Sequence, residues 1–241
     1  MPRSAAETAD TYPIRINTYL AHKGVATRRG ADELIANGKV LINGRVAVLG
    51  DKVHLGDRVE MRGAVSSKKF LYYAYHKPVG VITHSPQLGE KDIKKSVPMQ
   101  DIFPIGRLDK SSSGLIILTD DGRVTDRLLN PRYGHEKEYR VQTQEPLRAS
   151  FKKAMEAGVD IGGYLTKPCT VRVTGERSFS ITLTEGKKHQ IRRMVEALHN
   201  TVVGLERVRI LNIQLGKLAP GTWRTIEGEE LKTFLAEIGM K

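Results

Sequence analysis

Apolar side chains recur in short runs along this chain, and their spacing predicts which segments form strands and which form helices. Runs of strand length, rich in β-branched and aromatic residues, predict strands at 71–75, 80–83, 114–119, 138–143, 169–173, 179–184 and 207–215. Segments with an apolar helical face predict helices at 124–129, 146–157, 188–199 and 229–238. Elements in this order predict an α+β fold, with a mixed and largely antiparallel sheet flanked by helices.

A different arrangement is expected for residues 14–61, where two short helices precede a small twisted sheet. Thr27 is placed to cap the second helix, because a threonine side chain can accept a hydrogen bond from the first helical turn. Asn43 and Gly44 predict a type I′ hairpin turn, since both residues tolerate positive φ angles. These features predict a compact N-terminal domain.

Two polar segments set the expected domain boundaries. Residues 62–69 are polar, contain glycine and show no periodicity, so they predict a flexible linker. Residues 1–13 begin with a polar, acid-containing stretch that differs from signal and transit peptides, and they predict a disordered tail. The remaining residues, 70–241, are numerous enough to form a main domain with its own core.

The chain is strongly basic, with 39 Lys and Arg against 27 Asp and Glu among 241 residues, a net charge of +12 and a pI near 9.8. This balance favours an acidic partner such as RNA, and a generic cationic surface is the alternative. No stretch approaches the roughly 20 apolar residues of a membrane-spanning helix, so no membrane partner is expected. The single cysteine, Cys169, and the lack of zinc-type spacing predict a cytoplasmic protein without a structural metal.

Basic residues are dense in residues 14–61, which also contain a Gly-Lys-Val-Leu-Ile-Asn-Gly hairpin and a Leu-Gly-Asp turn. This combination resembles the S4 RNA-binding domain. We expect RNA phosphates to contact six basic side chains, namely Arg15, Lys23, Arg28, Arg29, Lys39 and Arg45. The N-terminus of the second helix adds a field that favours phosphate. A solvated basic face is the alternative interpretation.

The segment 106–122 contains the strongest candidate for chemistry, in the sequence Gly-Arg-Leu-Asp-Lys-Ser-Ser-Ser-Gly followed by an apolar strand. An isolated aspartate at a strand end is usually a turn or cap residue. Here Arg107 precedes Asp109 by two residues, and an extended backbone places both side chains on one side. Because Asp109 stands beside apolar Leu108, its ionised form requires a nearby cation. We therefore expect an arginine partner from elsewhere in the chain.

Two further motifs supply candidates for the same site. Arg192 and Arg193, in Gln-Ile-Arg-Arg-Met, point about 100° apart on a helix, so one can reach inward while the other faces phosphate. A solvated basic helix face is the alternative for this pair. Tyr139, in Lys-Glu-Tyr, can stack on an extruded base, although core packing is the commoner role of such a tyrosine. Lys137 is expected to brace the site or to touch phosphate.

Together, these three ordered motifs closely resemble those of pseudouridine synthases in the branch of RsuA, RluB, RluE and RluF, and most closely the RluF-type enzymes of the large ribosomal subunit. The resemblance implies that Asp109 is catalytic, that Arg192 pairs with it and that Tyr139 lies against the target base. It also implies that Arg107 fills the space of the flipped base. Leu205 is a candidate for the apolar residue under the uracil, and core packing is the commoner role of such a leucine. Ser112 departs from the threonine that many members have, but it keeps the hydroxyl group.

The implied activity is isomerisation of a specific uridine to pseudouridine in 23S rRNA. The sequence contains no cofactor-binding motif, so no cofactor is expected, and a monomer is the default expectation. The sequence leaves open whether Asp109 acts as a nucleophile on the sugar or as a base. A catalytically idle RNA-binding or ribosome-assembly factor is one alternative. Others are a synthase that acts on 16S rRNA or tRNA, and a hydrolase or glycosylase that releases free uracil.

Overall fold

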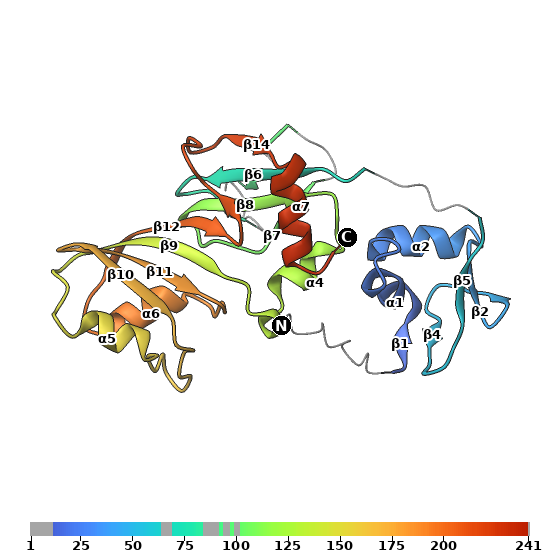
Figure 1. Ribbon diagram of the computed structural model, residues 1–241, viewed down its shortest axis with the longest axis horizontal. Helices are drawn as coiled ribbons and strands as arrows, with labels where there is room; N and C mark the ends of the chain where they lie inside the picture. Colours follow the sequence, from blue (N-terminus) through green and yellow to red (C-terminus); the bar gives the residue numbers. More distant parts are fainter. Residues whose placement is uncertain (1–11, 64–68, 84–91, 94–96, 99–101, 241) are drawn as a thin grey trace. The chain divides into compact units, whose positions relative to one another are not determined.

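Residues 12–63, 69–83, 92–93, 97–98 and 102–240 are described by the computed structural model of this protein (Figure 1). The chain divides into two compact units, 1–69 and 70–241, and the division falls at the end of the segment expected to be a linker. Most of the expected tail, residues 1–11, and most of the expected linker, residues 64–68, lie outside the described residues.

The first unit contains the two short helices and the small strands that the sequence predicts. Its elements are β1 (Ile14–Arg15), α1 (Ile16–His22), α2 (Arg28–Ala36), β2 (Val40–Ile42), β3 (Arg45–Val46), β4 (Lys52–Val53) and β5 (Val59–Met61). The Thr27 cap is confirmed, because its Oγ1 accepts a hydrogen bond of 3.0 Å from Gly30 N. The type I′ turn is also confirmed, with φ angles of 51° at Asn43 and 80° at Gly44.

The second unit is built on one sheet of nine strands. Its strands are β6 (Tyr72–Lys77), β7 (Phe103–Ile105), β8 (Ser113–Thr119), β9 (Lys137–Thr143), β10 (Thr170–Gly175), β11 (Ser178–Leu183), β12 (Val202–Ile210), β13 (Ile213–Gln214) and β14 (Trp223–Thr225). Their order is β10-β11-β9-β12-β8-β6-β14, with β13 on β12 and β7 on β8. Among the described strands the β8/β12 pair is parallel and the other pairs are antiparallel, which confirms the predicted mixed sheet.

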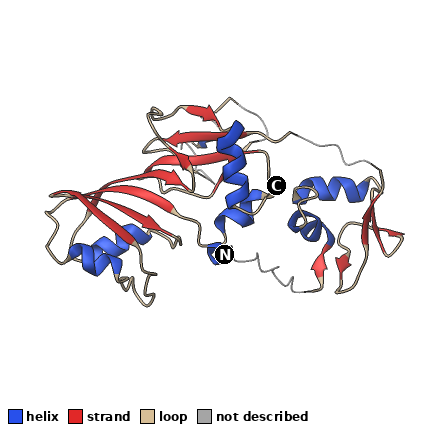
Figure 2. Ribbon diagram, viewed as in Figure 1, coloured by secondary structure: helices blue, strands red, loops and turns tan. Residues whose placement is uncertain are grey.

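Helices cover the two faces of this sheet at different ends (Figures 1 and 2). The helices are α4 (Val124–Leu129), the 3₁₀ turn η1 (Pro131–Tyr133), α5 (Phe151–Glu156), α6 (Gln190–Ala197) and α7 (Gly228–Glu237). In β12, Leu205 packs with the core under α5 and α6, whereas Val208 and Ile210 pack with the core under α4 and α7. Because side chains alternate along a strand, the two helix pairs lie on opposite faces.

A third apolar cluster lies on the α5/α6 face, at the other end of the sheet. It contains Tyr73, Tyr75, Ile116 and Leu118, which alternate with the residues of β6 and β8 that face α4 and α7. Leu108, which precedes β8, belongs to this cluster as well. One face of the sheet therefore holds two separate cores, and Tyr139 of β9 packs against both of them.

Three sequence predictions are corrected by the structure. Residues 80–83 are not a strand, because the Thr83 hydroxyl binds the backbone of Leu108 and only Ile82 forms a single bridge. The helix expected from residue 146 begins at Phe151, since the backbone N–H of Leu147 donates to Glu176 instead. The strand expected over 207–215 begins at Val202 and turns at Leu211, where φ is 51°.

Candidate active site

A tight loop between β7 and β8 presents Asp109. Leu108 is buried beneath the loop, and Thr83 Oγ1 donates to its carbonyl at 2.9 Å and accepts from its N–H at 3.2 Å. Ser112 N donates to Asp109 O at 3.0 Å, which closes the turn. The Asp109 side chain is 39% exposed, and Arg107 on the other side of Leu108 is exposed. The carboxylate is therefore held at the surface of a fixed loop, within reach of a substrate.

One transverse row of paired residues crosses β6, β8, β12 and β9. Lys77 of β6 is paired with Gly114 of β8, Gly114 with Arg207 of β12, and Arg207 with Tyr139 of β9. Paired residues of neighbouring strands point to the same face. Tyr139 is half-buried and packs against both cores, including the cluster that contains Leu108. The row therefore sets a phenol ring and two cations on the sheet face that carries the Asp109 loop.

Arg192, in α6, fastens the Asp109 loop to β12. Its Nη2 donates to Ser111 O at 3.1 Å and to Ser112 Oγ at 3.3 Å, and its Nη1 donates to Val202 O at 3.1 Å. The hydroxyl retained at Ser112 thus has a defined partner. Among the described residues, the Nε of Arg192 is buried without a hydrogen-bond partner, and no ion pair joins Arg192 to Asp109. The expected pairing is corrected accordingly: Arg192 holds the loop that carries the carboxylate.

The Asp109 carboxylate contacts His189, which directly precedes α6. His189 Nε2 lies 3.4 Å from Asp109 Oδ1. The sequence motif contains this histidine, but nothing in its pattern distinguished it from the neighbouring lysines. Its proximity to Asp109 depends on how α6 is set against the β7/β8 loop, which local sequence does not specify.

Two buried cations beside the site also escaped the sequence analysis. Lys77 is fully buried, and its Nζ donates to Pro78 O at 2.9 Å and to Val81 O at 2.7 Å. Burial lowers the pKa of Lys77 to about 8, while the Asp109 carboxylate raises that pKa and the Arg207 guanidinium lowers it. Arg207 is 4% exposed, and its Nε donates to Leu115 O at 2.7 Å. Positive charge is therefore built into the sheet close to Asp109.

The other expected site residues lie around this row. Lys137 is partly buried, donates to His135 O at 3.2 Å, and has a pKa lowered to about 8 by burial and by Arg207. Leu205 is half-buried on the face of Tyr139, packed with the core under α6. Arg193 points away from the loop, and its guanidinium lies against Gly162. The two arginines of α6 thus have separate surroundings, as their helical spacing predicts.

In the first unit, the basic residues expected to contact RNA are all exposed. Arg28 and Arg29 are the first two residues of α2, beside its free N–H groups. Lys23 lies over the ring of Tyr19 at 5.6 Å, and Arg45 pairs with Asp51 at 2.9 Å. Arg45 is therefore partly neutralised, whereas the helix start presents its charge to solvent.

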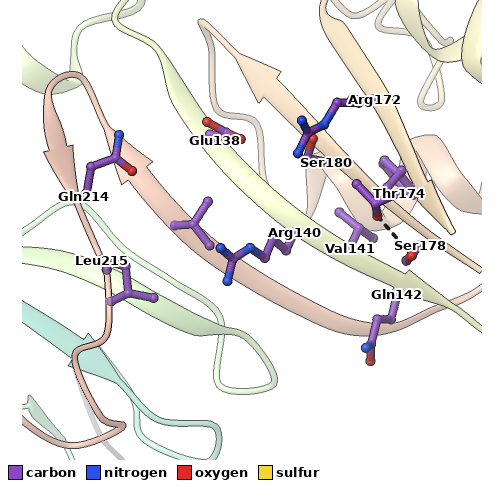
Figure 3. A pocket seen from close by; sticks show the side chains of 13 residues that line it. Glu138, Arg140, Val141, Gln142, Arg172, Thr174, Ser178, Ser180, Gln214 and Leu215 are labelled. Atoms are coloured by element: carbon purple, nitrogen blue, oxygen red, sulfur yellow. Dashed lines mark hydrogen bonds between the residues drawn. The ribbon is translucent and has the colours of Figure 1, made fainter.

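A groove of about 400 Å³ lies on the opposite sheet face, lined by β9, β10 and β11 and, on its other side, by Val208 of β12 and residues 214–216 (Figure 3). Arg140 is paired with Ser180, and Ser180 with Arg172, so these polar side chains form a row across three strands. Arg140 alternates with Tyr139 and therefore points away from the Asp109 face. The groove is distinct from the candidate active site.

Two further searches of the described residues concern other kinds of site. No group of three or more His, Cys, Asp or Glu side chains in the described ranges is arranged to hold a metal ion. Within the same residues, no helix has the length and apolar character needed to cross a membrane.

Comparisons with known proteins match both units. The family described as RNA pseudouridylate synthase matches residues 71–197, and the S4 domain family matches residues 14–59. The dual-specificity RNA pseudouridine synthase RluF of Escherichia coli strain K12 is 39% identical over 224 residues, which cover 90% of this chain and 77% of that protein. An RNA pseudouridine synthase of Aquifex aeolicus is 37% identical over 241 residues, which cover 95% of this chain and 96% of that protein.

Two other comparisons extend this similarity. The ribosomal small subunit pseudouridine synthase A of Vibrio cholerae is 36% identical over 169 residues, which cover 68% of this chain and 73% of that protein. A crystal structure of a pseudouridylate synthase superposes with a TM-score of 0.68 at 27% identity, over 91% of this chain and 99% of that chain. The fold and the sequence thus agree on the same group of proteins.

Proposed function

Because this chain belongs to the RNA pseudouridylate synthase family and is an isomerase that converts uridine in RNA to pseudouridine, we propose that its target lies in large-subunit ribosomal RNA and that Asp109 is its catalytic carboxylate. The observation that supports Asp109 is its placement. Asp109 lies on a loop above the sheet face that carries Tyr139 and Arg207. Arg192 holds the same loop through the backbone oxygen of Ser111. Lys77 and Arg207, on the same sheet face, place positive charge near this carboxylate.

The reaction exchanges one bond to the ribose for another. The N1–C1′ bond breaks, the uracil turns within the site, and C5 bonds to C1′. C5 loses its proton and N1 gains one, so the product is an isomer of the substrate. Asp109 assists the departure of uracil, as a nucleophile on the sugar or as a base that removes a sugar proton. Because the uracil is retained, no water has to be activated, and the second carboxylate that glycosidases use is not required.

The target base has to leave its stack to reach Asp109, at a cost of a few kcal/mol. The half-buried ring of Tyr139 offers a surface on which the flipped uracil can stack, and Leu205 lies on the same sheet face. Arg107 is exposed beside Asp109, where it can fill the space that the base vacates. Lys137 and Arg193 would meet phosphates around the target nucleotide.

Affinity for RNA would come largely from the first unit. Arg28 and Arg29 start α2, where the helix field and the side-chain charge both favour phosphate. These and the other exposed basic residues would neutralise RNA phosphates, so the affinity for RNA should fall steeply as the salt concentration rises. The choice of large-subunit rRNA is supported by the longer match to RluF than to the small-subunit enzyme, at 90% against 68% of this chain. We propose that the protein works on this RNA as a cytoplasmic monomer.

Mapping pseudouridine across total rRNA and tRNA, in cells with and without this protein, tests the target. The expected result is one or a few positions in large-subunit rRNA that lose pseudouridine when the protein is absent. Loss only in small-subunit rRNA or tRNA would overturn the proposed target. No loss anywhere would favour an RNA-binding or assembly factor.

Purified wild-type and Asp109→Asn proteins test the catalyst on the mapped RNA. The asparagine variant keeps the size of the side chain and removes its charge, so conversion is expected to stop while RNA binding persists. Conversion at the wild-type rate would show that another group is the catalyst. Release of free uracil, measured by mass spectrometry, would instead indicate a hydrolase or glycosylase.

A further inference from the structure

The turn that leads into α6 is anchored by a buried polar network. Glu185 is 4% exposed and accepts hydrogen bonds from Tyr164 Oη at 2.7 Å, Lys167 N at 3.0 Å and Gln190 Nε2 at 2.8 Å. Gln190 in turn accepts from Lys187 N at 2.8 Å. Lys187 and Gln190, at the two ends of the turn, are therefore both held by this network, and His189 between them has a defined position.

His189 occupies this turn in a left-handed backbone conformation, with φ 53° and ψ 29°. This conformation is unfavourable for an L-residue with a Cβ and is adopted most easily by glycine and asparagine. His189 is the N-cap residue of α6, yet its side chain makes no capping hydrogen bond. A histidine is thus held where glycine would fit better, and its imidazole does not serve the helix.

The imidazole contacts the Asp109 carboxylate instead. His189 Nε2 lies 3.4 Å from Asp109 Oδ1, with 48% of the histidine side chain and 39% of the aspartate side chain exposed. One turn further along α6, Arg192 binds the backbone oxygen of Ser111 and the hydroxyl of Ser112. The same rigid element therefore touches the loop twice, at its backbone through Arg192 and at its carboxylate through His189.

We propose that His189 is a positioning residue, which orients the Asp109 carboxylate toward the flipped nucleotide. This role rests on the proposed function of Asp109. Strained backbone conformations persist where the surrounding structure over-determines them, and they concentrate at functional sites. The histidine acts through Asp109 and needs no contact with the RNA.

The protein contains a matched control at the other end of α6. His199 is also left-handed, with φ 60°, and its side chain is exposed and carries no role in the site. Replacing either histidine with glycine relieves the same backbone strain, so both variants should be at least as stable as the wild type. Only the change at 189 removes a contact to Asp109.

The experiment compares wild type, His189→Gly, His189→Asn and His199→Gly by thermal unfolding, RNA affinity and single-turnover conversion at saturating enzyme. For His189→Gly we expect an unchanged or raised Tm, RNA affinity within about twofold, and a conversion rate lower by about threefold to tenfold, as for the loss of one polar contact to the carboxylate. His189→Asn keeps a side-chain N–H donor and tolerates the left-handed turn, so its conversion rate should lie between those of the wild type and His189→Gly. His199→Gly should convert at the wild-type rate.

Equal rates for wild type and His189→Gly would overturn the role of His189, and so would an equal loss in His199→Gly. A loss in His189→Gly explained entirely by weaker RNA binding would overturn it too. The outcome for Asp109→Asn separates this inference from the proposed function. If that variant is inactive while His189→Gly is fully active, only the inference about His189 fails.

Discussion

Gly114 lies so close to Arg207 in the neighbouring parallel strand that a Cβ at position 114 would stand 2.3 Å from the carbonyl oxygen of Arg207 and 2.4 Å from its nitrogen. The φ angle of Gly114 is 114°, which a residue with a side chain rarely adopts. The pairing of Ser113 and Gly114 with Glu206 and Arg207 joins β8 to β12. This contact sets the Asp109 loop over the row that contains Tyr139.

Substitution of Gly114 with alanine should therefore force β8 and β12 apart. The clash involves backbone atoms, which cannot rotate away, so we expect a loss of about 2–4 kcal/mol in the free energy of unfolding and a large loss of conversion. Urea unfolding and single-turnover assays measure the two effects. Gly163→Ala is the control, because Gly163 has φ 81° but open space around its Cβ position, and it should cost only about 1 kcal/mol. Equal losses in the two variants would contradict the close-approach argument.

Arg192→Lys should slow conversion without unfolding the protein. Lysine keeps the charge but cannot span Val202 on one side and Ser111 with Ser112 on the other, as the guanidinium does. Because small displacements of a catalytic group are costly, we expect the rate to fall about 10-fold to 100-fold. Arg193→Lys is the matched control and should have a much smaller effect. A comparable rate loss in both variants would argue against a loop-holding role for Arg192.

The stability of the protein should rise with pH above neutrality. The pKa of Lys77 is about 8 in the folded protein, against an ordinary value of 10.5, so between these values the unfolded chain binds more protons than the folded one. The free energy of unfolding therefore increases as pH rises through this window. Urea unfolding at several pH values from 7.5 to 9.5 measures the slope, and Lys77→Met should reduce it. Lys137, whose pKa is also lowered to about 8, leaves part of the slope in place. A slope unaffected by Lys77→Met would show that Lys77 is not its source.

Asp121, in the turn after β8, should be important for stability. It is fully buried, pairs with Arg123 at 2.6 Å and accepts a 2.6 Å hydrogen bond from the hydroxyl of Tyr72. The pKa of Tyr72 is raised above its ordinary range, mainly by burial and then by the hydrogen bond and negative charge of Asp121. Asp121→Ala removes the carboxylate that binds the buried Tyr72 hydroxyl and the Arg123 guanidinium. We therefore expect a loss of about 3–5 kcal/mol in the free energy of unfolding. Asp126→Ala, at an exposed pair with Arg132, should cost at most about 1 kcal/mol. Similar urea midpoints for the two variants would refute this difference.

The sequence by itself determined the local features of this protein. Thr27 and the Asn43-Gly44 pair specify their cap and turn through their own conformational preferences, and the strands at 114–119 and 138–143 follow from apolar periodicity. The motifs also drew attention to Asp109 and its neighbours, because unusual residue combinations are visible without any fold. The predicted start of α5 at residue 146 was wrong, because the Leu147 N–H donates to Glu176 O across the fold and the helix begins only at Phe151.

Only the tertiary structure decided which side chains meet. Lys77, Gly114, Arg207 and Tyr139 are far apart in the chain and form one row because four strands pair in a particular register. The packing of α6 against the β7/β8 loop then brings Arg192 to the loop oxygens and His189 to Asp109. Periodicity identifies a strand and its apolar face, but it carries no information about the neighbouring strand or its offset, so these contacts come from the fold as a whole.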